Sequence, residues 1–455
     1  MVTRVDVAPE VLYWAVERAG WDVETAAKRE PKFSEWVSGE ARPTVKQLEK
    51  FANKTHTPFG FLFLSEPPVE TVPIPDLRTV GSKGIRRPSA DLLDTIYLCQ
   101  NRQDWYRDYA LANGVEPLEF VGAATIDSPA EQVAARMREL LDFGLEDSSG
   151  SADRQSVLRA LVDSVERAGV LVMINGVVGD NTHRKLDCDE FRGFALCDPV
   201  VPLVFVNATD TKAAQIFTLI HELAHIWLGR SALSEAALDF RSEKAEELWC
   251  NSVAAEVLLP IDSLREEGLQ GVSSEELDRL ASKYKVSTLV VLKRIFDLGI
   301  LKWDEYVETY RNESARTKRL ANGSSRDTSG GNYYHTVPFR LSRSFARAVI
   351  SSAFEGTTLY RDAYRLLGTK KHSTFEKLAD AVGGCVMYLL DANIFIQAKN
   401  HHYAFDVVPG FWRWLERAHG IGIAGSVERV REELLVGKDE PDRAGESKGG
   451  QGLLF

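Results

Sequence analysis

Cysteine is scarce in this chain of 455 residues and follows no pairing pattern. The five cysteines are Cys99, Cys188, Cys197, Cys250 and Cys385. None of them stands in the C-x-x-C spacing of a metal-binding or redox motif, and their scatter excludes a disulfide framework. This pattern is typical of a protein from a reducing compartment.

Long apolar runs and an excess of basic residues are also missing. No apolar stretch approaches the roughly 18 residues that a membrane-spanning helix needs, and the amino terminus is polar and charged. The net charge of −11 and the pI near 5.5 exclude a general attraction to nucleic acid, so such contact requires a local patch. We therefore expect a soluble, cytoplasmic protein with about two to four domains.

Histidine is rare as well, with nine residues in the chain, and two of them lie in one short segment. Residues 218–228 read Thr-Leu-Ile-His-Glu-Leu-Ala-His-Ile-Trp-Leu, in which His221, Glu222 and His225 form an H-E-x-x-H motif. On a helix, the two histidines lie one turn apart on the same face, so both imidazoles can bind one metal ion beside Glu222. The motif indicates a zinc hydrolase. The alternative is a buried helix with two satisfied core histidines.

The residues around the motif favour the first interpretation. Apolar residues recur at helical spacing from Ile216 to Trp227, with Asp210 or Thr211 available as the N-cap. The motif therefore belongs to a helix that packs against a core.

A third ligand is needed, because tetrahedral catalytic zinc takes three protein ligands and leaves the fourth position to water. The next amphipathic segment, which ends at a proline, places Glu247 and Asn251 one turn apart. Glu247 can ligate, and Asn251 can orient a ligand from behind it. Glu246, Glu256 and Cys250 compete for the ligand role, Cys250 least well because its neighbours are apolar.

This region resembles the ImmA/IrrE family of bacterial metallo-endopeptidases. The matching blocks, which keep the family's order and spacing over about 70 residues, are residues 192–196, 202–207, 217–225 and 247–260. The resemblance implies zinc (Zn²⁺) held by His221, His225 and a downstream glutamate, best matched here by Glu247. It also implies a regulatory role in which the protein cuts or antagonises a repressor.

Residues 1–66 predict a bundle of short helices. The expected helices are Pro9 to Ala19, Val23 to Arg29, Lys32 to Val37 and Thr44 to Lys54. Together with Pro58 to Leu64 they resemble the XRE-type helix-turn-helix found on many ImmA/IrrE proteins. DNA binding is a separate question, because these residues hold nine Lys and Arg against ten Asp and Glu, and the expected recognition helix carries Glu35. A structural or protein-docking role is the alternative.

Residues 67–88, rich in proline, glycine and charge, predict a linker, and residues 89–310 the peptidase domain. Within that domain we expect three helices before the motif, at Leu92 to Asn113, Ser128 to Leu141 with Ser128 as cap, and Arg154 to Ala168. Strands are expected at Val170 to Ile174, Phe191 to Cys197 and Leu203 to Val206. An edge strand beside the metal helix can bind an extended peptide, although an ordinary capped edge fits the sequence equally well.

Residues 311–386 predict a linker followed by a helical extension of a kind that resembles that of related proteins. Its helices are expected at Phe345 to Phe354 and Leu359 to Leu367. Tyr333, Tyr334 and His335 could stabilise an oxyanion, but aromatic clusters more often serve packing.

From Met387 the character of the sequence changes. Residues 387–396 predict an apolar strand that delivers Asp391 at its end, a common place for a metal ligand. Residues 387–440 resemble the first half of a PIN-like ribonuclease, in which Asp391 and Glu433 match two of the acidic residues. Two carboxylates bind a hard dication poorly, so we expect no nuclease activity from this truncated segment. Residues 441–455 predict a disordered tail.

The sequence thus predicts an α+β multidomain protein with a helical amino-terminal domain, a mostly helical zinc peptidase domain with a small sheet, and a partial α/β segment at the end. The expected activity is zinc-dependent endopeptidase cleavage, or antagonism, of a repressor or toxin-antitoxin partner, with Glu222 as the general base. The rival interpretation is a non-cleaving antitoxin or transcription regulator that acts through the helix-turn-helix and protein binding.

Overall fold

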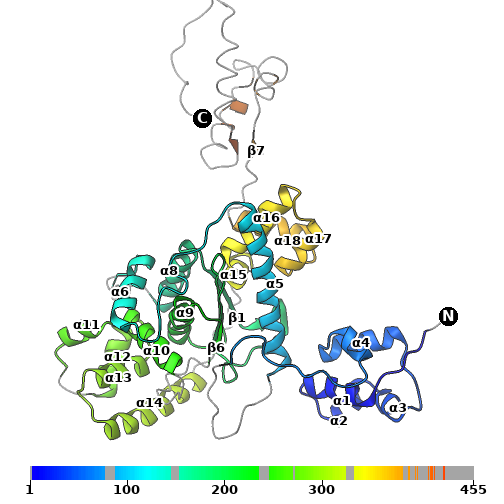
Figure 1. Cartoon of the computed structure of the whole chain (residues 1–455), viewed down its shortest axis with the longest axis horizontal. Helices are drawn as coiled ribbons and strands as arrows, with labels where there is room; N and C mark the ends of the chain where they lie inside the picture. Colours follow the sequence, from blue (N-terminus) through cyan, green and yellow to red (C-terminus); the bar gives the residue numbers. More distant parts are fainter. Residues whose placement is uncertain are drawn as a thin grey trace, which may run out of the picture. The chain divides into compact units, whose positions relative to one another are not determined.

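The computed structural model describes residues 3–76, 88–144, 153–234, 245–269, 272–323 and 333–382, with isolated positions beyond 382 (Figure 1). These parts are mostly helical with a small mixed sheet, as expected for an α+β protein. The chain divides into two compact units. The first comprises Met1–Gly331 with Phe339–Phe345, and the second comprises Asn332–Pro338 with Ala346–Phe455.

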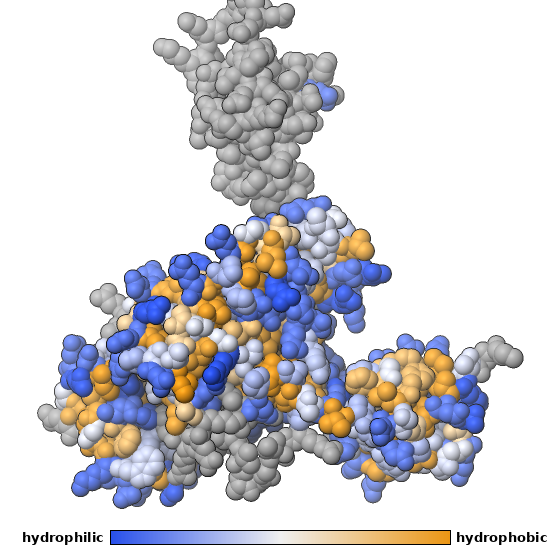
Figure 2. Space-filling view, viewed as in Figure 1, coloured by the Kyte–Doolittle hydropathy of each residue, from blue (hydrophilic) through white to orange (hydrophobic). Residues whose placement is uncertain are grey.

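No helix in the described ranges combines the length and the apolar character needed to cross a membrane. On the face that Figure 2 shows, hydrophilic residues interrupt the hydrophobic ones over the coloured surface.

The amino-terminal residues form the short helices that the sequence predicts. They are α1 (Pro9–Arg18), α2 (Val23–Arg29), α3 (Phe33–Ser38), α4 (Val45–Thr55) and the 3-10 helix η1 (Phe59–Phe63). Thr44 begins α4 through a capping box with Gln47, since each side chain bonds the other residue's backbone N–H. Leu12, Leu48 and Phe51 lie fully buried in the core of this bundle. The four predicted helices are confirmed to within one residue at each end.

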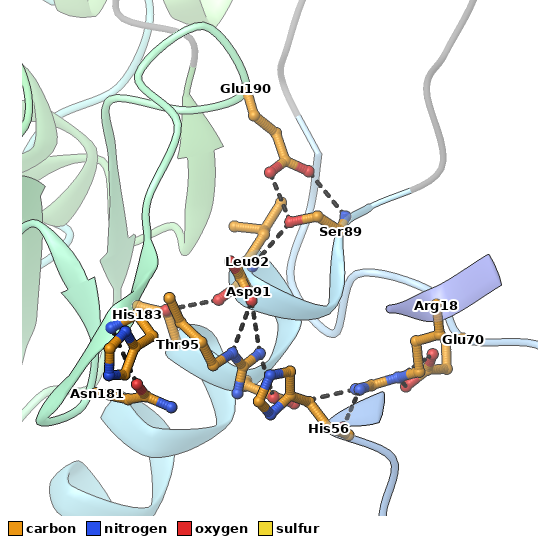
Figure 3. Close-up of polar contacts among 12 residues, drawn as sticks. Arg18, His56, Glu70, Ser89, Asp91, Leu92, Thr95, Asn181, His183 and Glu190 are labelled. Atoms are coloured by element: carbon orange, nitrogen blue, oxygen red, sulfur yellow. Dashed lines mark hydrogen bonds and ion pairs between the residues drawn. The ribbon is translucent and has the colours of Figure 1, made fainter. Parts of the chain in front are cut away.

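A buried arginine ties these helices to the long helix α5 (Ala90–Ala112). Arg18 pairs with Glu70 at 2.8 Å and with Asp94 of α5 at 3.0 Å, and it donates to the backbone carbonyl of His56. Figure 3 shows the Arg18 guanidinium beside His56 and Glu70. Arg184 also pairs with Asp94 at 2.7 Å, so the Asp94 carboxylate bridges the guanidinium groups of Arg18 and Arg184. The Arg18 side chain is only 4% exposed, which makes this a buried network.

The sheet has four strands in the order β1-β5-β4-β6, namely β1 (Leu171–Asn175), β5 (Leu203–Asn207), β4 (Gly193–Leu196) and β6 (Ala232–Ser234). β1 runs parallel to β5, and the other neighbours are antiparallel. Every residue of these strands is buried, as expected for a sheet that is covered on both faces. A separate hairpin pairs β2 (Val177–Val178) with β3 (Asn181–Lys185).

Helices cover the sheet on both sides (Figure 1). α8 (Arg154–Arg167) and α9 (Lys212–Trp227) pack on one face, and α5 contacts the other. α10 (Ala245–Leu258) packs against α9 and against α6 (Ala130–Leu141). One predicted cap is wrong: the N-cap of α6 is Pro129, because the Ser128 hydroxyl instead accepts from the backbone N–H of Thr125.

Four helices complete the first unit after α10, namely α11 (Ile261–Glu266), α12 (Ser274–Lys283), α13 (Thr288–Asp297) and α14 (Trp303–Gly323). Ser273 and Ser287 cap α12 and α13 by accepting from the backbone N–H groups of Glu276 and Val290.

The second unit takes in parts of α15 (Tyr333–Leu341) and α16 (Arg343–Phe354), and then α17 (Tyr360–Leu367) and α18 (His372–Ala381). Phe375 lies at the centre of an aromatic cluster with Phe354, Tyr360 and Tyr364. β7 (Tyr388–Leu389) pairs in parallel with β8 (Ala424–Gly425). The predictions for Asp391, for Glu433 and for residues 441–455 lie outside the described residues, as do those for the side chains of Tyr333, Tyr334 and His335.

Candidate metal centre

The H-E-x-x-H motif lies on α9, a helix that is buried along most of its length. Of the two residues predicted as the N-cap of α9, Thr211 is the cap, because its hydroxyl accepts a hydrogen bond from the backbone N–H of Ala214. Asp210 instead pairs with Arg192 at 3.4 Å. The side chains of His221, Glu222 and His225 all lie at 0% exposure.

Three candidate ligand residues converge at the carboxyl half of α9. The Nε2 atoms of His221 and His225 lie 3.2 Å apart. Glu247, from the first turn of α10, places Oε2 3.3 Å from the His221 nitrogen and Oε1 3.3 Å from the His225 nitrogen. Zinc bonds of about 2.0 Å in a tetrahedron separate neighbouring ligand atoms by about 3.3 Å. The donor set and its spacing therefore fit zinc.

The structure also separates the competitors for the third ligand. Glu246 faces the other nitrogen of His225, with Oε1 3.3 Å from Nδ1, and pairs with Arg230 at 2.7 Å. Glu256 pairs with Arg294. Cys250 is fully buried, burial raises the pKa of its thiol to about 11, and it is not part of the cluster of converging ligand atoms. Among the described residues, His221, His225 and Glu247 alone form such a cluster.

Each imidazole has a polar group behind it. Glu246 stands behind His225, and Asn251, one turn after Glu247, lies close enough to His221 to raise the pKa of its imidazole. His221 Nδ1 and Asn251 Oδ1 are both buried without a hydrogen-bond partner among the described residues. An imidazole that binds a metal through Nε2 carries its proton on Nδ1, so this donor and this acceptor are complementary.

The charges within the cluster couple strongly. Burial lowers the pKa of His221, although the Glu247 carboxylate opposes the effect. Burial alone would raise the pKa of Glu247, but the two imidazoles dominate and hold it well below its usual range. Glu247 is therefore ionised at neutral pH, as a metal ligand must be.

Glu222 is held apart from this ion pairing. Neither of its carboxylate oxygens has a hydrogen-bond partner among the described residues, and burial raises its pKa to about 8, with the nearby His225 opposing the shift. Gly193 of β4 lies directly beside it, since a Cβ on that glycine would stand 3.0 Å from Glu222 Oε1 and 2.6 Å from Thr218 Cγ2. A glycine is therefore required where β4 passes the motif helix.

Two residues of the site carry no local signal in the sequence. Gly193 lies within residues 192–196, one of the blocks that resemble the family, and Ser234 lies outside all four blocks. Ser234 Oγ lies 3.2 Å from His225 Nε2 and 3.3 Å from Glu247 Oε1. Its strand, β6, has three residues, which is too short for an alternating pattern to stand out.

The sequence leaves open whether the edge strand beside the metal helix binds an extended peptide or is an ordinary capped edge. β4 and β5 are interior strands, and the edge nearest the motif is β6. The backbone N–H of Leu233 in β6 donates to Pro75 O at 2.9 Å, and Leu233 forms a parallel bridge with Asp76. At this residue the edge is capped by the chain's own segment.

Comparison with family models gives three matches. Residues 165–296, which include the sheet strands, α9 and α10, match the IrrE N-terminal-like domain, named Peptidase_M78. Residues 341–381 match a domain of unknown function, DUF8813, and residues 388–443 match another, DUF4411. A search of the curated proteins finds no match to the chain. The resemblance to the ImmA/IrrE family is thus supported for the part of the chain that holds the candidate centre, and the matched family is one of peptidases.

Proposed function

We propose that this protein is a zinc-dependent regulatory endopeptidase with His221, His225 and Glu247 as metal ligands. The observation that carries the proposal is the convergence of two imidazole Nε2 atoms 3.2 Å apart with the Glu247 carboxylate, whose two oxygens each lie 3.3 Å from one of these nitrogens. Next to them lies the Glu222 carboxylate, which is buried and makes no ion pair among the described residues. The match of residues 165–296 to a peptidase family supports it.

Zinc bound at this centre would polarise the scissile carbonyl and lower the pKa of a water molecule. Glu222 then has two tasks as general base and general acid. Its carboxylate removes a proton from the attacking water, and the resulting carboxylic acid delivers that proton to the nitrogen of the departing amine. A carboxyl group whose pKa lies near neutrality suits both steps, and burial supplies such a pKa.

The groups behind the ligands keep this arrangement fixed. Glu246 Oε1 lies 3.3 Å from His225 Nδ1, and Asn251 Oδ1 is a buried, unsatisfied acceptor next to His221, so each is available to a protonated Nδ1. These contacts hold both imidazoles with Nε2 directed at the metal. The buried core around α9 keeps bulk water from the Glu222 carboxylate.

The substrate that we propose is a protein, either a repressor or a component of a toxin-antitoxin pair, in the cytoplasm. The resemblance to ImmA/IrrE proteins suggests this class. Residues 1–66 would supply an XRE-type helix-turn-helix, and their balanced charge favours docking to protein at least as well as contact with DNA. The PIN-like interpretation of residues 387–440 remains a prediction.

The test is to co-express the neighbouring genes with the wild type and with Glu222→Gln. We expect a new cleaved fragment with the wild type, and none with Glu222→Gln, although this variant keeps its zinc. Equal fragments from both proteins would overturn the proposal. A wild type that holds zinc, binds its partner and leaves it intact would instead support a non-cleaving antitoxin or transcription regulator.

A further inference from the structure

The hydroxyl of Ser234 lies within the cluster of ligand atoms. Its Oγ donates to Glu247 Oε1 over 3.3 Å and lies 3.2 Å from His225 Nε2. The side chain is completely buried, at 0% exposure. Both atoms that it contacts belong to groups that the proposed function assigns to zinc.

The backbone of Ser234 is fixed by its strand. β4 pairs with β6 so that Gly193 stands opposite Ser234 and Phe194 opposite Leu233. On the outer side of β6, the N–H of Leu233 donates to Pro75 O at 2.9 Å. β6 is therefore held from both sides, which gives the Ser234 hydroxyl a defined position.

The cross-strand pair of Gly193 and Ser234 forms one wall of the centre. Gly193 leaves room for the Glu222 carboxylate, because any side chain there would approach its Oε1 within 3.0 Å. Ser234, on the neighbouring strand, supplies the polar group of the pair. A small residue and a hydroxyl thus stand side by side where β4 and β6 meet the motif helix.

The chemistry of the hydroxyl limits its role. Serine has one proton to donate, and a His225 nitrogen that binds a metal has no lone pair left to accept it. Of the two atoms within 3.3 Å of Ser234 Oγ, Glu247 Oε1 is therefore the acceptor, and the two oxygens of this carboxylate face two different imidazoles. A hydrogen bond to Oε1 therefore fixes the rotation of the carboxylate about its last bond.

We propose that Ser234 is a positioning residue, which holds the Glu247 carboxylate in the orientation that a metal bound by His221 and His225 requires. This inference rests on the proposed zinc site. Hydrogen bonds to ligating carboxylates typically contribute 10- to 100-fold to metal affinity.

The test measures Zn²⁺ affinity of the full chain by competition with a chromophoric chelator. Ser234→Ala should bind Zn²⁺ about 10- to 100-fold more weakly than the wild type. Ser252→Ala is the matched control, because Ser252 is exposed on α10 and, among the described residues, its hydroxyl donates to Leu248 O of the same helix. Its affinity should equal that of the wild type.

Ser234→Thr keeps the hydroxyl and should bind Zn²⁺ nearly as tightly as the wild type, which separates loss of the hydrogen bond from loss of the fold. The visible spectrum of bound Co²⁺ should also change in Ser234→Ala and stay constant in Ser252→Ala. Wild-type affinity in Ser234→Ala would overturn the inference and leave the proposed function standing. A wild type without Zn²⁺ affinity would overturn both.

Discussion

A methyl group added at Gly193 should disrupt the centre without touching a metal ligand. The added Cβ in Gly193→Ala would lie 2.6 Å from Thr218 Cγ2, 2.8 Å from the carbonyl oxygen of Phe205 and 3.0 Å from Glu222 Oε1. Phe205 cannot retreat, because its strand pairs with β1 on one side and with β4 on the other. Strand β4 or the motif helix must therefore move.

The size of the effect follows from these contacts. Overpacking a well-packed core typically lowers the free energy of unfolding by about 1 to 3 kcal/mol. We expect about 3 kcal/mol for Gly193→Ala, because the carbonyl oxygen of Phe205 belongs to a strand that is paired on both sides. Opening of the strand should then become roughly 150-fold more frequent, since each 1.4 kcal/mol corresponds to a factor of ten. The chain has several parts, so a local measurement is preferable to a global unfolding curve.

Hydrogen–deuterium exchange of peptides that cover β4 and α9 supplies that measurement. We expect exchange in Gly193→Ala to accelerate by about two orders of magnitude in β4. Gly60→Ala is the control, because a Cβ at Gly60 meets nothing within 4 Å and its backbone needs no positive φ. Thr218→Ser removes Cγ2 and should restore part of the protection in the double variant. Unchanged exchange in Gly193→Ala would refute the reasoning about close approach.

Three further predictions concern ligand identity, electrostatics and the amino-terminal helices. Glu247→Ala should lose zinc while Glu256→Ala keeps it, as metal analysis after gel filtration would show, and zinc retained by Glu247→Ala would contradict the ligand assignment. In metal-free protein, Glu222→Gln should raise the free energy of unfolding by about 3 kcal/mol at pH 7, because the folded pKa of about 8 lies above the ordinary 4.5. The gain should grow from pH 4.5 to pH 8 and vanish below this range, where both forms are neutral; denaturant titrations at several pH values check the sign. Arg18→Met should destabilise the amino-terminal helices by about 3 kcal/mol, because Glu70 loses its buried arginine partner and Asp94 keeps only Arg184. Arg42→Met, at an exposed pair, should change the free energy of thermal unfolding by less than about 1 kcal/mol.

The helices of the first unit were predictable because their signals are local. Thr44 with Gln47, Ser273 and Ser287 mark helix starts, and caps act within one turn of the residue that carries them. The predicted cap of α6 is wrong because two local hydrogen bonds compete for the Ser128 hydroxyl. It accepts from the backbone N–H of Thr125, which precedes it, and not from the first turn of the helix.

The centre was predictable in part. His221, Glu222 and His225 share one turn of helix, and their spacing is sufficient to bring them together. The choice among Glu246, Glu247 and Glu256 depends on how α10 packs against α9, which periodicity along one helix does not specify. Ser234 and Gly193 reach the site through pairing of β4 with β6, across 41 positions of sequence, from 193 to 234. Such contacts leave no local pattern.

The central claim is that two imidazole nitrogens and one glutamate hold zinc. X-ray absorption at the zinc edge of the loaded wild-type protein tests it most directly. The account predicts one zinc per chain with nitrogen and oxygen neighbours at about 2.0 Å, and the imidazole scattering of two histidines. A sulfur neighbour at about 2.3 Å would assign Cys250 to the metal and contradict the account. Absence of histidine scattering would do the same.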